Sequence, residues 1–225
     1  INLTAPNSTA AGQAFCVFDS LFLINSYVNF AIANPPAIPQ LPKTNARFPA
    51  AGPGANGAFF SSSTNALHIG ANMWSSWDVL HHEFGHYMTF FYNLYDPPNS
   101  GGSHAITANL TGSQFSRTDG TVVTRNKLRG ISTAWSEGYP TFFGTRAQQS
   151  IFALAPVLNT NVPTTNDTVY SDLANNFSYD LEGLSFTVNG VTTNVTASGE
   201  DSELAVQRFL FDLADGRNEP LDTIE

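Results

Sequence analysis

Cysteine and positive charge are both scarce in this chain. A single cysteine, Cys16, occurs among 225 residues, which excludes a disulfide within the chain and a zinc site built from cysteine thiolates. Nine Lys plus Arg stand against 18 Asp plus Glu, and no basic run occurs. Binding to nucleic acids and to anionic membranes depends on positive charge, so the composition argues against both as partners.

The composition is nevertheless that of a folded domain. Hydrophobic residues make up 42% and charged residues 12%, whereas disorder requires low hydrophobicity with high charge. No linker or internal repeat interrupts the sequence, so we expect one domain over 1–225. The sequence begins at Ile1 without methionine, and we expect a mature or excised piece of a longer chain. The abundance of neutral Asn, Ser and Thr favours a secreted or extracellular protein.

Hydrophobic periodicity predicts an α+β fold in which helices dominate. We expect helices over 13–33, 78–92, 132–150 and 201–214, and short strands at 59–60, 66–69, 122–123 and 185–188. Asp19 and Asn25 interrupt the apolar first helix, so we interpret it as a buried amphipathic helix and not as a membrane span. Phe18 and Phe22 widen its predicted buried stripe.

The segment with the most chemical information contains His82, Glu83 and His86 in the pattern His-Glu-x-x-His. Residues four apart on a helix lie on one face, so the two imidazoles can bind one metal ion. Glu83 then points beside the metal, where it can take a proton from a bound water. Gly85 weakens the helix, which indicates close approach of another segment. We interpret His81 as a packing residue rather than a ligand.

A catalytic zinc ion needs a third protein ligand and an open position for water. A further histidine near position 92 would complete a longer signature, but that position is Tyr92. Glu137 is the best candidate, because it lies in an apolar predicted helix, where a charge usually has a partner or a metal. The less favoured candidates are His68, His104, Asp119 and Asp172. Of these, we expect His104 to be exposed in a Gly/Ser loop.

His82-Glu83-Phe84-Gly85-His86, followed by Ser136-Glu137-Gly138, resembles the gluzincin branch of the zincin metallopeptidases, the thermolysin-like clan. The resemblance implies a zincin-like fold with one catalytic zinc ion bound by His82, His86 and Glu137, and with Glu83 as general base. It also implies a small sheet whose edge strand lines the cleft. Ala66 to Ile69 would be that edge strand.

Two positions depart from this pattern. Many gluzincins carry an acidic residue four positions after the glutamate ligand, and here that position is Thr141, a weaker partner for a ligand histidine. Pro140 lacks an N–H, so the helix must begin near Ser136 or kink there. The donors that stabilise the transition state in the family cannot be ranked among Tyr139, Tyr170 and Tyr179.

The sequence therefore predicts a zinc-dependent peptidase, an endopeptidase by preference, whose partner is a protein or peptide substrate. A catalytically inactive binding module on the same scaffold is the main alternative, and a zinc hydrolase with a non-peptide substrate is a third. Calcium at Asp119-Gly120 or within 212–215 stays open, although solvated turns are the simpler interpretation. The sequence leaves substrate specificity and oligomeric state undetermined.

Overall fold

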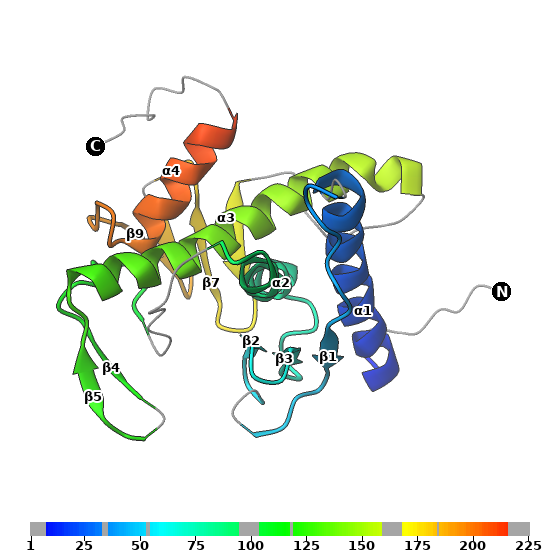
Figure 1. Ribbon diagram of the computed structural model, residues 1–225, viewed down its shortest axis with the longest axis horizontal. Coiled ribbons are helices and arrows are strands. Elements are labelled where there is room, and N and C mark those ends of the chain that lie inside the picture. Colours follow the sequence, from blue (N-terminus) through cyan, green and yellow to red (C-terminus); the bar gives the residue numbers. More distant parts are fainter. Residues whose placement is uncertain are drawn as a thin grey trace.

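A computed structural model describes residues 8–32, 36–52, 55–94, 104–117, 119–158, 168–183 and 185–215. The fold is mixed α+β, as expected, with helices packed at the centre and three small sheets around them (Figure 1). The helices are α1 (Ala10–Tyr27), continued by the π-helical turn η1 (Val28–Ile32), α2 (Trp77–Tyr92), α3 (Lys127–Leu158) and α4 (Glu203–Asp215). The strands are β1 (Asn45–Arg47), β2 (Ala58–Ser61), β3 (Ala66–Ile69), β4 (Gln114–Ser116), β5 (Val122–Thr124), β6 (Val169–Asp172), β7 (Phe177–Asp180), β8 (Ser185–Val188) and β9 (Val191–Asn194).

The first sheet supports the helix that carries the His-Glu-x-x-His motif. Its strand order is β1-β3-β2, with β1 parallel and β2 antiparallel to β3. The expectation that Ala66–Ile69 forms the edge strand is therefore wrong, because β3 pairs on both sides. The buried pattern of β3 agrees with a central strand, whereas every residue of β2 is partly exposed. The edge next to α2 is β2.

The remaining strands form a hairpin, β4-β5, and an antiparallel four-stranded sheet in the order β6-β7-β8-β9. Aromatic rings stack across the four-stranded sheet from Tyr170 through Tyr179 to Phe186, with ring centroids 5.1 and 6.2 Å apart. Tyr179 and Tyr170 are buried in the main core. The sheet thereby places an aromatic layer beside the helices.

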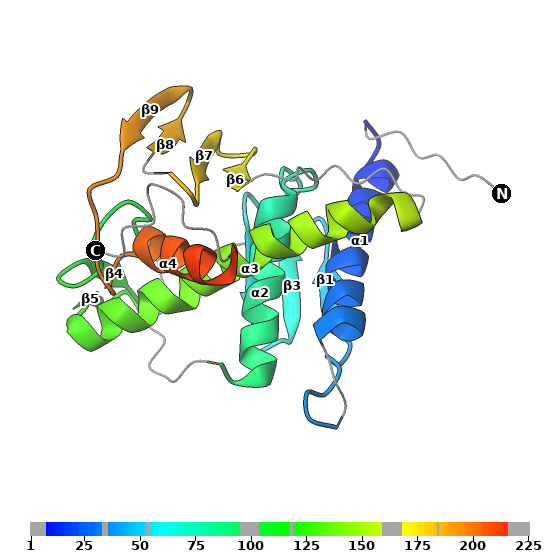
Figure 2. The same cartoon turned by 90° about the horizontal axis from the view of Figure 1, so that it is seen from above.

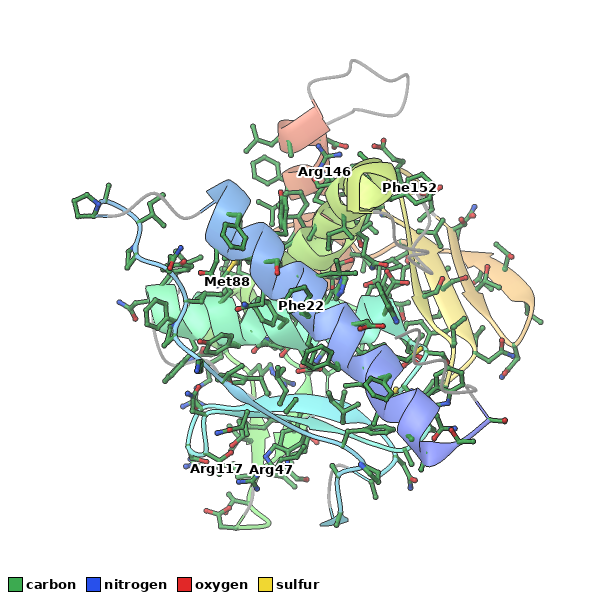
Figure 3. The ribbon with its side chains drawn as sticks, turned by 90° about the vertical axis from the view of Figure 1, so that its right-hand side faces the viewer. Phe22, Arg47, Met88, Arg117, Arg146 and Phe152 are labelled. Atoms are coloured by element: carbon green, nitrogen blue, oxygen red, sulfur yellow. The ribbon has the colours of Figure 1, made fainter. Side chains whose placement is uncertain are left out.

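Helix α1 is half buried and half exposed. Thr9 caps it by accepting a hydrogen bond from the Gly12 N–H at 3.1 Å. Val17 and Ile24 are buried, as the periodicity predicted, but Phe18 and Phe22 are 61% and 57% exposed. These phenylalanines therefore do not widen the buried stripe. Figure 3 shows α1 from its outer side, where Phe22 lies.

Helix α3 crosses both α2 and α1, and α4 lies alongside it (Figure 2). A Cβ atom on Gly85 would lie 2.8 Å from Pro140 Cα, so the predicted close approach at Gly85 is confirmed. Of the two alternatives at Pro140, a helix that begins near Ser136 is wrong, because α3 starts at Lys127 and continues through Pro140. Packing against α2 holds this proline in a position where helix propensity alone would end the helix.

Candidate metal centre

The two histidines of the motif, His82 and His86 on α2, direct their Nε2 atoms toward each other. The Nε2 atoms of His82 and His86 lie 3.0 Å apart, one helical turn from each other. Glu137 reaches the same place from α3, and its Oε2 atom lies 3.2 Å from His86 Nε2 and 3.4 Å from His82 Nε2. All three side chains are largely buried. The fold thus brings together the three residues that the sequence predicted as ligands.

His82 Nε2, His86 Nε2 and Glu137 Oε2 form a triangle, and Glu83 lies beside this triangle. His82, Glu83 and His86 offer ligand atoms that all lie within 4.8 Å of one another, an arrangement that could hold a metal ion. Glu137 is not in that group, but its Oε2 atom lies within 3.4 Å of the Nε2 atoms of the same two histidines. The candidate donors for a metal are therefore His82 and His86 with a carboxylate from Glu137, from Glu83 or from both.

The second nitrogen of His82 is fixed by Thr141, one turn after Glu137 on α3. His82 Nδ1 and Thr141 Oγ1 lie 2.7 Å apart, and the Thr141 hydroxyl donates to the Glu137 carbonyl at 3.3 Å. Because the hydroxyl hydrogen is used there, the oxygen accepts the N–H of His82 Nδ1. This tautomer leaves the lone pair of His82 Nε2 directed into the triangle, as a metal ligand requires.

Edge strand β2 anchors Glu83 from the other side. The backbone N–H of Phe60 donates to Glu83 Oε2 at 2.9 Å. Burial raises the pKa of Glu83 above its ordinary value, and the opposing effects of His86 and His82 do not cancel this. A carboxylate with a raised pKa is a stronger base than one in water. One oxygen of Glu83 is held in place while the side chain keeps the basicity that proton transfer requires.

The electrostatics of the triangle favour positive charge. Burial alone would raise the pKa of Glu137, but His86, His104 and His82 hold it well below its usual range. Burial would likewise lower the pKa of His86, but the carboxylate of Glu137 raises it to about 9. In this site His86 and Glu137 stabilise opposite charges on each other. A bound cation would replace those protons.

His104 belongs to the same cluster, contrary to the expectation that it is exposed. Its side chain is only 22% exposed, and its Nε2 atom lies 3.5 Å from Glu137 Oε2. Its Nδ1 atom lies 2.9 Å from Oε2 of Glu203 on α4, a carboxylate that is 1% exposed. Burial would lower the pKa of His104, but contacts with both carboxylates raise it to about 10.

Sequence reasoning missed the roles of His104 and Glu203 in this cluster. His104 follows a Gly/Ser stretch without periodicity, and Glu203 occupies the first turn of α4, where acidic residues are common. Neither residue has a sequence neighbour that points to a metal site. His104 is one of five histidines in the chain, but no local pattern joins it to Glu137 or to Glu203.

The other candidate ligands lie outside the cluster. His68 stacks on Phe59 with ring centroids 4.6 Å apart. The carboxylates of Asp119 and Asp172 accept backbone N–H groups within their own turns. His81 is fully buried, with Nε2 3.2 Å from the Ser20 carbonyl, so the interpretation of His81 as a packing residue is confirmed.

The three tyrosines considered as transition-state donors lie in different places. Tyr170 packs edge-on against His82, with ring centroids 6.2 Å apart. Tyr179 stacks behind Tyr170, and Tyr139 packs against Phe142. Among these three, only Tyr170 has a recorded ring contact with the triangle.

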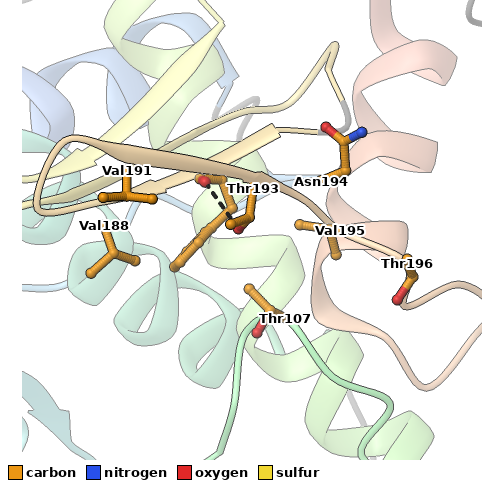
Figure 4. A pocket seen from close by; sticks show the side chains of 8 residues that line it. Thr107, Val188, Val191, Thr193, Asn194, Val195 and Thr196 are labelled. Atoms are coloured by element: carbon orange, nitrogen blue, oxygen red, sulfur yellow. Dashed lines mark hydrogen bonds between the residues drawn. The ribbon is translucent and has the colours of Figure 1, made fainter.

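A pocket of about 320 Å³ lies on the β8–β9 hairpin (Figure 4). Its walls carry no charged side chain, and none of them is a candidate ligand. The pocket is lined by Thr107, Phe186, Val188, Val191, Thr193, Asn194, Val195 and Thr196. It is therefore separate from the metal centre.

Comparison with models of protein families, with curated proteins and with solved structures found no match for this chain. No helix among the described residues has both the length and the apolar character needed to cross a membrane.

Proposed function

We propose that this protein is a zinc-dependent peptidase that uses Glu83 as general base. The observation that carries the proposal is the triangle formed by His82, His86 and Glu137, with edges of 3.0, 3.2 and 3.4 Å. Donors of a tetrahedral zinc ion, each about 2.0–2.1 Å from the metal, lie about 3.3–3.4 Å apart. The triangle has nearly these dimensions.

The chemistry of the donors also favours zinc over harder cations. Two imidazole nitrogens and one carboxylate oxygen are a common catalytic zinc set, whereas magnesium and calcium prefer oxygen ligands alone. A zinc ion bound there would lower the pKa of a water molecule to about 7 and polarise a carbonyl group. Two donors come from one helix and the third from its neighbour, so the site exists only when α2 and α3 are packed together.

Glu83 has the properties of the base that such a reaction needs. Its Oε2 atom is anchored by the Phe60 N–H, and its pKa is raised by burial. The anchor leaves the other carboxylate oxygen to accept a proton from water and to return it to the leaving amine. Because Glu83 adjoins His82 on α2, the base and the two histidine ligands lie on one helix.

Strand β2 supports a peptide as the substrate. It is an edge of its sheet, and the Phe60 N–H on its unpaired side reaches the catalytic carboxylate. An extended peptide can add to such an edge through backbone hydrogen bonds, which would bring its own carbonyl groups to Glu83. This edge is β2 rather than the strand that the sequence suggested.

The test is a comparison of Glu83→Gln with the wild type. Glutamine preserves the acceptor for Phe60 but cannot take up a proton, so we expect about one zinc ion per chain in both proteins and roughly 10²–10⁴-fold slower peptide cleavage in the variant. Glu200→Gln is the matched control, because Glu200 is exposed and pairs with Lys127. A Glu83→Gln protein that cleaves casein as fast as the wild type would refute the assignment. A wild type that binds zinc but cleaves no peptide would favour the binding module.

A further inference from the structure

Glu203 is a buried carboxylate whose Oε1 atom is hydrogen-bonded and whose Oε2 atom lies at ion-pair distance from a histidine without a hydrogen bond. Oε2 lies 2.9 Å from His104 Nδ1, and Oε1 accepts a hydrogen bond from Gln207 Nε2 at 3.1 Å. A carboxylate that is 1% exposed is unfavourable without such partners. Gln207 is itself fully buried on the same helix. Gln207 therefore holds the Glu203 carboxylate through Oε1, and Oε2 lies at ion-pair distance from the ring of His104.

The segment that begins at His104 is also tied to the start of α4. The Leu110 N–H donates to the Asp201 carbonyl at 2.8 Å, and the Thr111 N–H donates to the Asp201 carboxylate at 3.0 Å. These bonds join the backbone shortly after His104 to the residue two positions before Glu203. The contact is thus part of a built interface between this segment and α4.

Helix α4 sits unusually close to α3 next to Glu137. A Cβ atom on Gly138 would lie 3.0 Å from Val206 Cγ1 and 3.1 Å from the Glu203 carbonyl. Only a residue without a side chain allows α4 to approach this near without a shift. The approach occurs one residue after Glu137, so α4 contacts α3 directly beside the backbone of the third proposed ligand.

The other nitrogen of His104 faces the metal centre. Its Nε2 atom lies 3.5 Å from Glu137 Oε2, the same oxygen that faces His82 and His86. Both ring nitrogens of His104 thus face carboxylate oxygens at ion-pair distance, although Nδ1 makes no hydrogen bond in this geometry. A protonated imidazole can donate from both nitrogens. Carboxylates that bind metals are commonly held by such donors, which fix their orientation.

We propose that His104 positions the metal ligand Glu137, and that Glu203 holds His104 for this task. The inference rests on the metal site of the proposed function. This role makes α4 part of the metal centre, although α4 supplies no ligand. The Glu203 carboxylate of α4 contacts the His104 imidazole, which contacts the Glu137 carboxylate of the triangle. His104 is thereby a positioning residue.

The experiment measures zinc affinity rather than peptidase activity. His104→Phe keeps a ring of similar size without nitrogens, and Glu203→Gln keeps the shape of the carboxylate. The matched controls are His68→Phe, since His68 stacks on Phe59 outside the cluster, and Glu200→Gln, since Glu200 is exposed. The zinc dissociation constant is measured by competition with a chelator, and the visible spectrum of the cobalt-substituted protein reports the geometry of the ligands. Thermal unfolding of the metal-free proteins shows whether each variant folds.

We expect His104→Phe to weaken zinc binding about 10–100-fold, with a smaller loss in the same direction for Glu203→Gln and none in the controls. The cobalt spectrum should shift in both test variants, since the Glu137 carboxylate is then free to turn. Metal-free unfolding temperatures close to that of the wild type would assign the loss to the site rather than to the fold.

Three results would overturn the inference. Zinc affinity and cobalt spectra that match the wild type in both test variants would show that Glu137 needs no support from His104, while the proposed function would stand. Loss of zinc binding by more than about 1,000-fold in His104→Phe would make His104 a fourth ligand, which closes the position that a catalytic zinc keeps open. A wild-type protein that binds no zinc would refute the proposed function, and the inference with it.

Discussion

Replacement of Gly85 by alanine tests the packing that forms the metal centre. Gly85 lies between His82 and His86 on α2, at the point where α2 meets Pro140 of α3. An added Cβ atom would lie 2.8 Å from Pro140 Cα and 2.9 Å from Pro140 Cβ. The substitution therefore pushes apart the two helices that supply the ligands, without changing a ligand.

The size of the effect follows from these distances. Carbon atoms in contact lie about 3.5–4.0 Å apart, so the helices must separate by roughly 0.6–1 Å at this crossing. Alanine improves helix propensity by up to about 1 kcal/mol, whereas overpacking costs about 1–3 kcal/mol. Ligand distances in metal sites tolerate only about 0.2 Å. We therefore expect a loss of stability between zero and about 3 kcal/mol, but at least a tenfold loss of zinc affinity.

The assay pairs zinc competition against a chelator with urea unfolding of the metal-free protein. Gly57→Ala is the control, because an added Cβ atom there meets nothing within 4 Å. The reasoning predicts that zinc affinity falls in Gly85→Ala alone. A Gly85→Ala protein that is more stable than the wild type and binds zinc equally well would show that the crossing can relax, and would refute the argument.

Three further substitutions test separate parts of the structure. Thr141→Val removes the oxygen that accepts the Nδ1–H of His82 and should weaken zinc binding about 10–100-fold in chelator competition; an unchanged affinity would contradict this role. Asp78→Asn weakens the hydrogen bond from Gln148 that joins α2 to α3 and should lower the free energy of unfolding by about 1–3 kcal/mol, measured in urea. Burial lowers the pKa of His81 to about 4, so as the pH falls below 6.5 this imidazole is protonated in the unfolded chain before it is protonated in the folded protein. Between pH 7 and 4.5 the metal-free protein should lose about 2–3 kcal/mol of stability through this group, and His81→Gln should lose correspondingly less; identical pH profiles would contradict the prediction.

The helices that the sequence predicted well are those whose apolar residues repeat with helical spacing. The helix predicted over 78–92 is observed as Trp77–Tyr92, and the one predicted over 201–214 as Glu203–Asp215. On α2 the same spacing places the two candidate histidine ligands on one face, so local sequence predicts both the helix and half of the candidate site. Glu137 could be proposed because a charge in an apolar helix requires a partner.

The four-stranded sheet was largely missed for a physical reason. Strand β9 is exposed at all of its residues, so it has no alternation of apolar and polar positions. Strands β6 and β7 are held by aromatic stacking between Tyr170 and Tyr179 and by pairing with each other. Both interactions join separate segments, which a local pattern does not record.

Helix α3 runs from Lys127 to Leu158, beyond both ends of the helix predicted over 132–150, although its sequence contains residues that weaken helices. Gly138, Pro140 and Gly144 all argue for a break when they are judged by propensity. In the structure each of them marks a close contact with another helix: Gly138 with α4, Pro140 with Gly85 of α2, and Gly144 with His81 of α2. Tertiary packing compensates for the lost propensity.

These weak positions surround the residue that the site depends on. Glu137 is followed by Gly138 and lies one turn before Thr141, so α4 approaches it on one side and α2 on the other. A conflict between local propensity and the observed helix is expected where function requires close approach. The same glycine that admits α4 brings Glu203, and with it His104, to the centre. Gly138 was therefore the sequence signal for Glu203 and His104. Without knowledge of α4, a glycine at this position indicates only a weakened helix.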